Sequence, residues 1–193
     1  MRMNLGGARR ARHAAVLALA VAFFIAFAAH TAHAQGFDEN RYFQQCLLFE
    51  AGGDLETARQ ACLNALQVRP NFAAAELALA RIELKLGDVA SAENRLRRVR
   101  DKIDTAEPLV LLAEAALASE RPSDAEALLQ EAEARLAQQG NVELEGRVSF
   151  LRARIMQSQG RFQEALDAYR AAILGNPLDA DYRLADAALR LRL

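Results

Sequence analysis

The chain is poor in the side chains on which most catalytic and metal sites depend. It contains no tryptophan, and its three histidines, His13, His30 and His33, all lie within the first 33 of 193 residues. Beyond them no imidazole can activate a nucleophile or ligate a metal ion. Acidic pairs such as Glu131 and Glu133 are two positions apart and would point to different faces of a helix. We therefore expect no catalytic residues, no cofactor and no metal site, although catalysis by two carboxylates stays formally possible.

The first 34 residues differ in composition from the rest. Four arginines and no acidic residue are followed by an unbroken apolar run over residues 14–29 and then by Ala32-His33-Ala34. This order is typical of a secretory signal peptide cleaved after Ala34. The apolar run is shorter than the ~20 residues that a spanning helix needs. We expect a periplasmic or secreted protein without stable membrane insertion after cleavage; an uncleaved membrane anchor is the alternative.

Residues 35–193 also lack an excess of basic residues. Four of the 24 basic residues and none of the 25 acidic ones lie in the first 34, which leaves residues 35–193 with a net charge of about −5. Nucleic-acid binding requires a basic face, so a nucleic-acid partner is not expected. The length suits one domain with a sizeable core.

A 34-residue period runs through residues 35–193. Gly53-Asp54 recurs as Gly87-Asp88, and small and apolar residues recur in the same frame in four units. The members are Tyr42, Cys46, Phe49, Gly53, Ala58, Cys62, Ala65 and Pro70 in the first unit; Leu79, Ala80, Gly87, Ala92, Leu96 and Val99 in the second; Leu109, Leu112, Ala113, Ala125, Leu129 and Ala132 in the third; Ala153, Met156, Gly160, Ala165, Tyr169, Ala172 and Pro177 in the fourth. The third unit lacks the turn glycine, and about six extra residues near Gly140 separate it from the fourth.

This pattern resembles the tetratricopeptide repeat, a helix-turn-helix of about 34 residues. The resemblance implies an all-α, right-handed solenoid of about four repeats over residues 39–72, 73–105, 106–140 and 142–178. A capping helix is expected over 179–192. The expected helix pairs are 39–52 with 55–68, 73–86 with 89–103, 107–119 with 122–138, and 142–159 with 162–174.

The resemblance also implies a concave groove formed by the first helix of each pair, in which a peptide or helix of a partner protein binds. Large apolar side chains in an open groove, such as Phe43 and Phe150, favour this interpretation. The alternative is an ordinary solvated helix face. The residues at the groove positions are Asn40, Phe43, Leu47, Glu50, Leu77, Arg81, Lys85, Val110, Glu114, Arg147, Phe150, Arg154 and Gln157.

These observations together predict a non-enzymatic protein-binding adaptor or scaffold in the cell envelope. By analogy with its class, such a protein assists the assembly of envelope machinery. The alternative is a membrane-anchored or accessory subunit of an envelope enzyme or assembly complex.

Cys46 and Cys62 are the only cysteines, and export would place both in an oxidising compartment. In an antiparallel helical hairpin that turns near Asp54, these two positions face each other, and the repeat pattern points both between its helices. We therefore predict a disulfide; two buried free thiols are the alternative.

Overall fold

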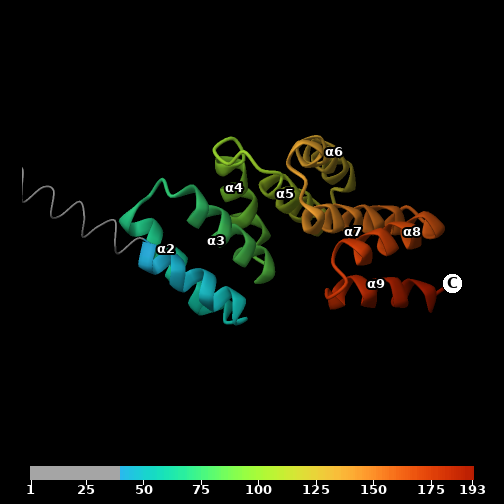
Figure 1. Cartoon of the computed structure of the whole chain (residues 1–193), viewed down its shortest axis with the longest axis horizontal. Coiled ribbons are helices and arrows are strands. Elements are labelled where there is room, and N and C mark those ends of the chain that lie inside the picture. The colour runs from blue at the N-terminus through green and yellow to red at the C-terminus, as the bar shows by residue number, and fades with distance from the viewer. Residues whose placement is uncertain (1–39) are drawn as a thin grey trace, which may run out of the picture.

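The computed structural model describes residues 40–193. The expected signal peptide, residues 1–34, lies outside this part of the chain. Within it, helices alternate with short turns and no strand is formed, which confirms the all-α solenoid fold (Figure 1). None of these helices is long and apolar enough to cross a membrane.

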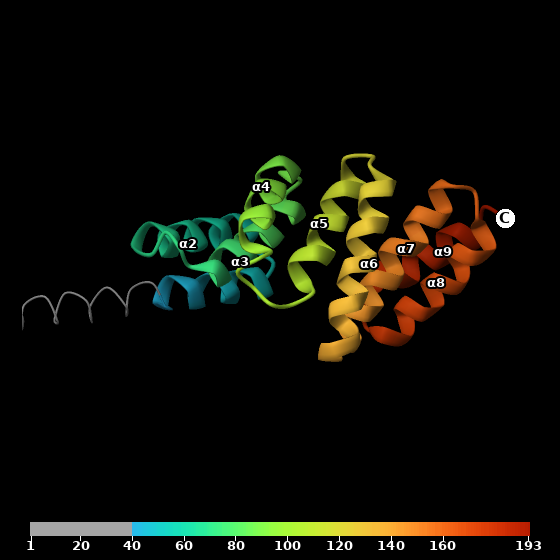
Figure 2. The same ribbon diagram turned by 90° about the horizontal axis from the view of Figure 1, so that it is seen from above.

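Paired helices follow the predicted boundaries closely. A helical segment over residues 40–51 precedes the others. The helices that follow this segment are α2 (Leu55–Val68), α3 (Ala73–Lys85), α4 (Val89–Val99), α5 (Glu107–Ala118), α6 (Pro122–Gln139), α7 (Val142–Ser158), α8 (Phe162–Gly175) and α9 (Ala180–Arg190). Consecutive helices pack as hairpins, and the hairpins follow one another along the molecule (Figures 1 and 2). Residues 40–51 therefore lie at one end of the stack and α9 at the other.

The turns inside the hairpins share one backbone conformation. Gly53, Gly87 and Gly160 have φ angles of 79°, 83° and 76°. Because L-residues rarely adopt this left-handed conformation, glycine is the favoured residue there. In the third repeat, Glu120 takes the same role with a φ of 57°. The third repeat therefore keeps its turn without a glycine, because Glu120 adopts the strained left-handed conformation instead.

Buried alanines let the helices of each hairpin approach closely. Ala58, Ala92, Ala125 and Ala165, one in each repeat, are fully buried. They belong to four apolar clusters that follow one another along the stack. Each cluster uses side chains from neighbouring repeats, so the core is continuous, as expected for a solenoid.

One predicted boundary is wrong by four residues. The helix expected over 89–103 ends at Val99, and Ile103 packs instead against the apolar cluster that contains Leu77 and Leu96. Tertiary packing of this one apolar side chain outweighs the helical preference of the residues before it.

Candidate binding groove

Three hollows follow one another along the face formed mainly by the first helix of each pair. The first, which we call the N-terminal cleft, has a volume of about 550 Å³. It lies between the segment 40–51, α3 and the connection from α4 to α5. Its lining is Phe43, Leu47, Ala73, Ala74, Leu77, Ala78, Arg81, Lys102, Ile103, Thr105 and Glu107. Apolar side chains dominate it.

The second hollow, the central cleft, is polar and has a volume of about 420 Å³. It begins at Arg81 and Glu107, which also line the N-terminal cleft. From there it extends to the starts of α7 and α9, so widely separated segments of the chain meet around it. Its lining is Arg81, Lys85, Glu107, Asn141, Glu143, Leu144, Arg147, Asn176, Asp179 and Tyr182.

The third hollow, the C-terminal cleft, has a volume of about 540 Å³ and is again mainly apolar. It lies between α7, the start of α8 and the length of α9. Its lining is Phe150, Arg154, Gln157, Ser158, Gly160, Phe162, Tyr169, Ala185, Ala188 and Arg192. Thus two apolar clefts flank a polar one.

Most of the thirteen predicted groove residues line these clefts, but four do not. Val110 is fully buried in the core, so it cannot line a groove. Asn40 is exposed at the start of the described helix and Glu114 lies on α5, and neither belongs to a cleft lining. The fourth, Glu50, is held in ion pairs. The other nine divide among the N-terminal, central and C-terminal clefts.

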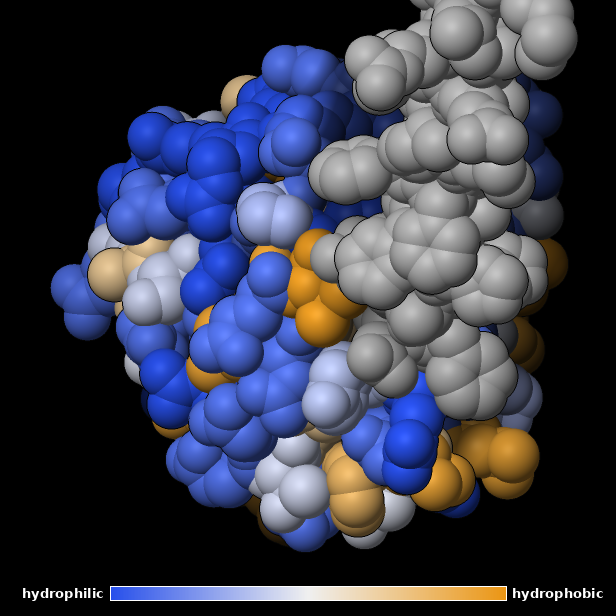
Figure 3. All heavy atoms as spheres, turned by 90° about the vertical axis from the view of Figure 1, so that its left-hand side faces the viewer, coloured by the Kyte–Doolittle hydropathy of each residue, from blue (hydrophilic) through white to orange (hydrophobic). Residues whose placement is uncertain are grey.

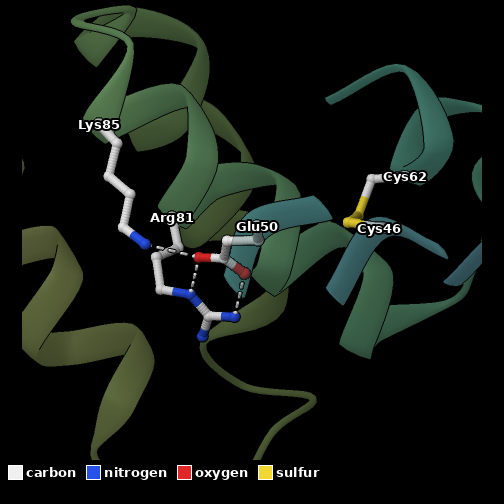
Figure 4. The surroundings of a disulfide bond; sticks show 5 residues. All are labelled: Cys46, Glu50, Cys62, Arg81 and Lys85. Atoms are coloured by element: carbon white, nitrogen blue, oxygen red, sulfur yellow. Dashed lines mark hydrogen bonds and ion pairs between the residues drawn. A yellow bond between two sulfur atoms is a disulfide. The ribbon is translucent and has the colours of Figure 1, made fainter. Parts of the chain in front are cut away.

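Glu50 connects the first repeat to the second through charged hydrogen bonds (Figure 4). Arg81 donates to both of its carboxylate oxygens at 2.7 and 2.8 Å, and Lys85 donates to one at 2.8 Å. Only 7% of the Glu50 side chain is exposed. Burial acts to raise the pKa of Glu50, but the bonds from Arg81 and Lys85 outweigh it and leave the pKa below the ordinary value. Glu50 therefore acts as a structural anion.

Two further charged residues of the central cleft, Glu107 and Arg147, also form ion pairs. Arg81 also contacts Glu107 on α5, and Arg147 on α7 contacts Glu114. These ion pairs join successive first helices across the groove face. The predicted cations Arg81, Lys85 and Arg147 thus serve first to hold the repeats together.

Phe150 has a different role from the exposed anchor that the sequence predicted. Its ring stacks on Tyr182 of α9 with a centroid distance of 4.6 Å, and it contacts Tyr169 of α8 at 5.7 Å. Only part of the ring faces the C-terminal cleft, since the side chain is half-buried. Phe150 therefore joins the last hairpin to α9 and separates the central cleft from the C-terminal one.

The sequence did not lead us to predict that α9 contributes to the groove. Sequence reasoning treated this helix only as a cap, yet it supplies Ala185 and Ala188 to the C-terminal cleft, and Arg192 follows it. The signal was present in the 34-residue period, because Leu184, Ala188 and Leu191 lie 34 positions after Phe150, Arg154 and Gln157. Extending the frame by one helix would have found Ala188, but not Ala185 or Arg192.

The disulfide prediction is confirmed. Cys46 and Cys62 are bonded, their Cα atoms are 5.1 Å apart, and both side chains are fully buried. Cys46 lies one helical turn before Glu50, so the disulfide and the Glu50 ion pairs hold the same helix against its two neighbours (Figure 4).

The surface at the α2 end of the stack is mostly hydrophilic, with smaller hydrophobic patches (Figure 3). Exposed large apolar side chains are more frequent toward the other end, where Leu174, Leu178, Leu184, Leu191 and Leu193 are each at least 67% exposed. Among the described residues, no group of three potential ligands could hold a metal ion.

Comparison with known proteins agrees with this architecture. Sequence models of the tetratricopeptide repeat match residues 49–107, 110–175 and 150–193. The chain belongs to the tetratricopeptide-repeat family. The last match includes α9, in keeping with its place in the repeat frame. No protein of curated function matches the chain.

Several solved structures share the fold. The PilF protein of Pseudomonas aeruginosa has a TM-score of 0.63 and 19% identity, over 82% of this chain and 70% of that one. The MamA protein has a TM-score of 0.57 and 20% identity, over 80% and 81%. YrrB, described as a repeat protein with an unusual peptide-binding site, has a TM-score of 0.55 and 17% identity, over 85% and 82%. At these identities the likeness concerns the fold alone.

Proposed function

We propose that this protein is a non-enzymatic adaptor or scaffold of the cell envelope, and that it binds a peptide or helix of a partner protein along the three clefts. Tetratricopeptide-repeat proteins commonly act as protein-interaction scaffolds. The observation that carries the proposal is the convergence of side chains from successive first helices on two apolar clefts. Accessible apolar clefts with a few polar groups at their edges are typical of peptide-binding surfaces.

The carboxylates of the groove face favour binding over catalysis. A general acid needs a raised pKa, whereas that of Glu50 is lowered by Arg81 and Lys85. Burial does raise the pKa of Glu83, although Arg95 opposes the shift. Glu83 is only 1% exposed, however, and it lines none of the three clefts. Neither Glu50 nor Glu83 therefore combines a raised pKa with a place in an open cleft.

The envelope location rests on the composition of the first 34 residues. If the signal peptide is processed as proposed, the exported protein begins at Gln35, and mass measurement of protein recovered from the cell envelope will show this start. A membrane-bound species that retains residues 1–34 would instead support an uncleaved anchor.

Site-specific photocrosslinking in the producing cell tests the groove. A photoreactive amino acid is placed at Ala74 in the N-terminal cleft or at Ala188 in the C-terminal cleft, both of which are exposed. Ala90 on α4 and Ala127 on α6 are matched controls, because they are exposed alanines on second helices outside all three clefts.

We expect a discrete protein adduct from at least one cleft position and none from the controls. Adducts from Ala90 or Ala127 alone would place the binding surface on the second helices and refute the groove. A product of altered small-molecule chemistry in the absence of any protein adduct would favour an enzyme instead.

A further inference from the structure

Two arginines of the C-terminal cleft have no partner for their side chains in the part of the chain that the structure describes. Arg154 on α7 and Arg192 after α9 line the same cleft, and neither guanidinium forms a hydrogen bond or ion pair with the described residues. This differs from Arg81, which binds Glu50 and Glu107 where the N-terminal cleft meets the central one. The two apolar clefts are thus similar in size, but the arginine of the N-terminal cleft is paired, whereas the two arginines of the C-terminal cleft are not paired with any described residue.

The nearby carboxylates are already bound to other arginines. Asp186 on α9 accepts two hydrogen bonds from Arg190, at 2.8 and 3.0 Å. Glu164 near the start of α8 is bound in the same way by Arg161. The positive charge of the cleft is therefore not neutralised from within the repeat that forms it.

Gln157 adds a further donor to the cleft. Its amide oxygen accepts a hydrogen bond from the Tyr169 hydroxyl at 2.8 Å, so its amide nitrogen is the group left for a ligand. Two guanidinium groups and an amide N–H therefore border a mainly apolar hollow. Such a set of donors requires a ligand that brings acceptors, and guanidinium groups form strong, charge-assisted hydrogen bonds with carboxylates.

An apolar stripe on α9 continues from the cleft. Leu184, Ala188 and Leu191 are spaced by four and three residues, which places them on one helix face. Leu184 is 68% exposed and Leu191 is 89% exposed, while Ala188 also lines the cleft. In the cleft itself, 37% of Phe162 is exposed. A ligand that neutralised the arginines could therefore also bury apolar side chains.

We propose that the C-terminal cleft is a docking site for a partner segment in which an aspartate or glutamate adjoins a large apolar side chain. The acidic side chain binds Arg154 and Arg192, and the apolar side chain packs between Phe162 and Ala188. This deepens the proposed function, on which it rests, by assigning the kind of peptide and the end of the groove that takes it. Apolar burial supplies affinity, and the paired arginines select for the acid.

Selection from a library of random peptides displayed on phage provides the probe. The peptides are fused to the coat protein through their C-termini, so side chains are their only source of carboxylates. Residues 35–193 are immobilised as bait. We expect enrichment of sequences in which an acid lies next to or one helical turn from Leu, Ile or Phe.

The highest-ranked peptide is then synthesised with blocked termini, and its affinity is measured for a set of variants. Arg154→Gln and Arg192→Gln should each weaken binding about tenfold, as for loss of a charge-assisted hydrogen bond. Arg41→Gln is the matched control, because Arg41 is exposed, has no ion pair with any residue of 40–193 and lines none of the three clefts. Arg154→Glu should reject the acidic peptide but regain affinity for a peptide whose acid is replaced by lysine.

The remaining outcomes distinguish this site from the general function. Enriched peptides without acids, or an affinity unchanged by both arginine variants, would overturn the site while leaving a peptide-binding groove intact. Loss of binding on Ala74→Trp alone would move the site to the N-terminal cleft. Dimers of residues 35–193 that dissociate on Leu184→Asp would show that a second copy covers the stripe, which also overturns the proposal. Enrichment of no peptide at all would contradict both the site and the proposed function.

Discussion

The first and last hairpins are held together in different ways. In the first, the disulfide Cys46–Cys62 joins the segment 40–51 to α2. In the last, α7 and α8 cross at two glycines, and a Cβ atom added to Gly175 would lie 2.7 Å from the Cα of Gly146. Among the described residues the first hairpin packs on the second repeat alone, whereas the last hairpin packs on both the third repeat and α9. One end uses a covalent bond and the other uses close backbone contact.

The same two ends differ in how they use arginine. Arg81 is only 24% exposed and is held by Glu50 and Glu107, so its charge serves the joint between repeats. Arg154 is exposed and forms no ion pair with another described residue, so its charge is open to a ligand. The comparison teaches that groove position alone does not make a residue a binding residue. A charged residue in the groove can bind a ligand only if its charge is not already neutralised by another residue of the protein.

Removal of the disulfide should have the largest effect on stability. In the chain-entropy model, closing a loop of this length stabilises the fold by about 3 kcal/mol. The Cys46→Ala/Cys62→Ala variant should therefore lose up to about 3 kcal/mol of unfolding free energy, measured by denaturant titration. Reducing agent should reproduce the loss in the wild type and have no effect on the variant. An equal stability of oxidised and reduced protein would contradict this account of the first hairpin.

Gly175→Ala should disturb the last hairpin instead. The new methyl group meets backbone atoms that cannot turn away, which typically costs about 1–3 kcal/mol. Hydrogen exchange should quicken in α7, α8 and α9 but not in α2. Gly52→Ala is the control, since its added Cβ would meet nothing nearer than 3.5 Å. Similar losses from both variants would show that the glycine crossing is unimportant.

Glu50→Gln should weaken the joint between the first two repeats by about 1–3 kcal/mol at neutral pH, because Arg81 and Lys85 lose their anion. The pKa of Glu50 is lowered in the fold, so its contribution is present above the ordinary value of 4.5 and is lost as the pH falls through the folded pKa. The difference in unfolding free energy between variant and wild type should therefore shrink in acid.

Glu83→Gln is a control for which the expected pH dependence of stability has the opposite sign. Burial raises the pKa of Glu83, despite the bonds from Arg95, so its contribution to stability declines as the pH rises through the folded pKa. Relative to this variant, the wild type should gain stability as the pH falls. If the stability advantage of the wild type over Glu50→Gln grew in acid, as expected for Glu83→Gln, the assignment of Glu50 as the structural anion would be contradicted.

Arg154→Gln should have the smallest effect on stability, within about 0.5 kcal/mol, because an exposed and unpaired side chain loses no contact. Arg81→Gln should destabilise the protein measurably, since it leaves Glu50 buried with Lys85 as its remaining cation. Thermal unfolding of the two variants side by side checks the contrast. A Tm lowered as much by Arg154→Gln as by Arg81→Gln would mean that Arg154 is structural.

Much of the fold could be predicted because the repeat frame fixes it. The pairing of Cys46 with Cys62 followed from the hairpin geometry, and the glycines at 53, 87 and 160 marked the turns. The early end of α4 could not be predicted, because it depends on Ile103 packing against residues of other helices. The glycine contact in the last hairpin was equally hidden, since it appears only when α7 and α8 cross.

The site could be predicted less well than the fold. The repeat frame places side chains on the first helices, but it does not say which of them are covered or neutralised. Val110 satisfied the spacing and is buried, while Glu50 satisfied it and is held by two cations. Phe150 was expected as an open anchor, but its partners Tyr182 and Tyr169 come from other helices. Such pairing depends on three-dimensional neighbours.

Hydrogen exchange of residues 35–193 with and without the selected acidic peptide tests the central claim most directly. The claim is that an acidic peptide binds at the C-terminal end of the groove, where Arg154 and Arg192 have no partner among the described residues. It predicts slower exchange in α7 and α9 on binding, and no change in α2 or α4. Protection confined to the segment 40–51 and α3 would contradict it, because binding would then occur away from these two arginines.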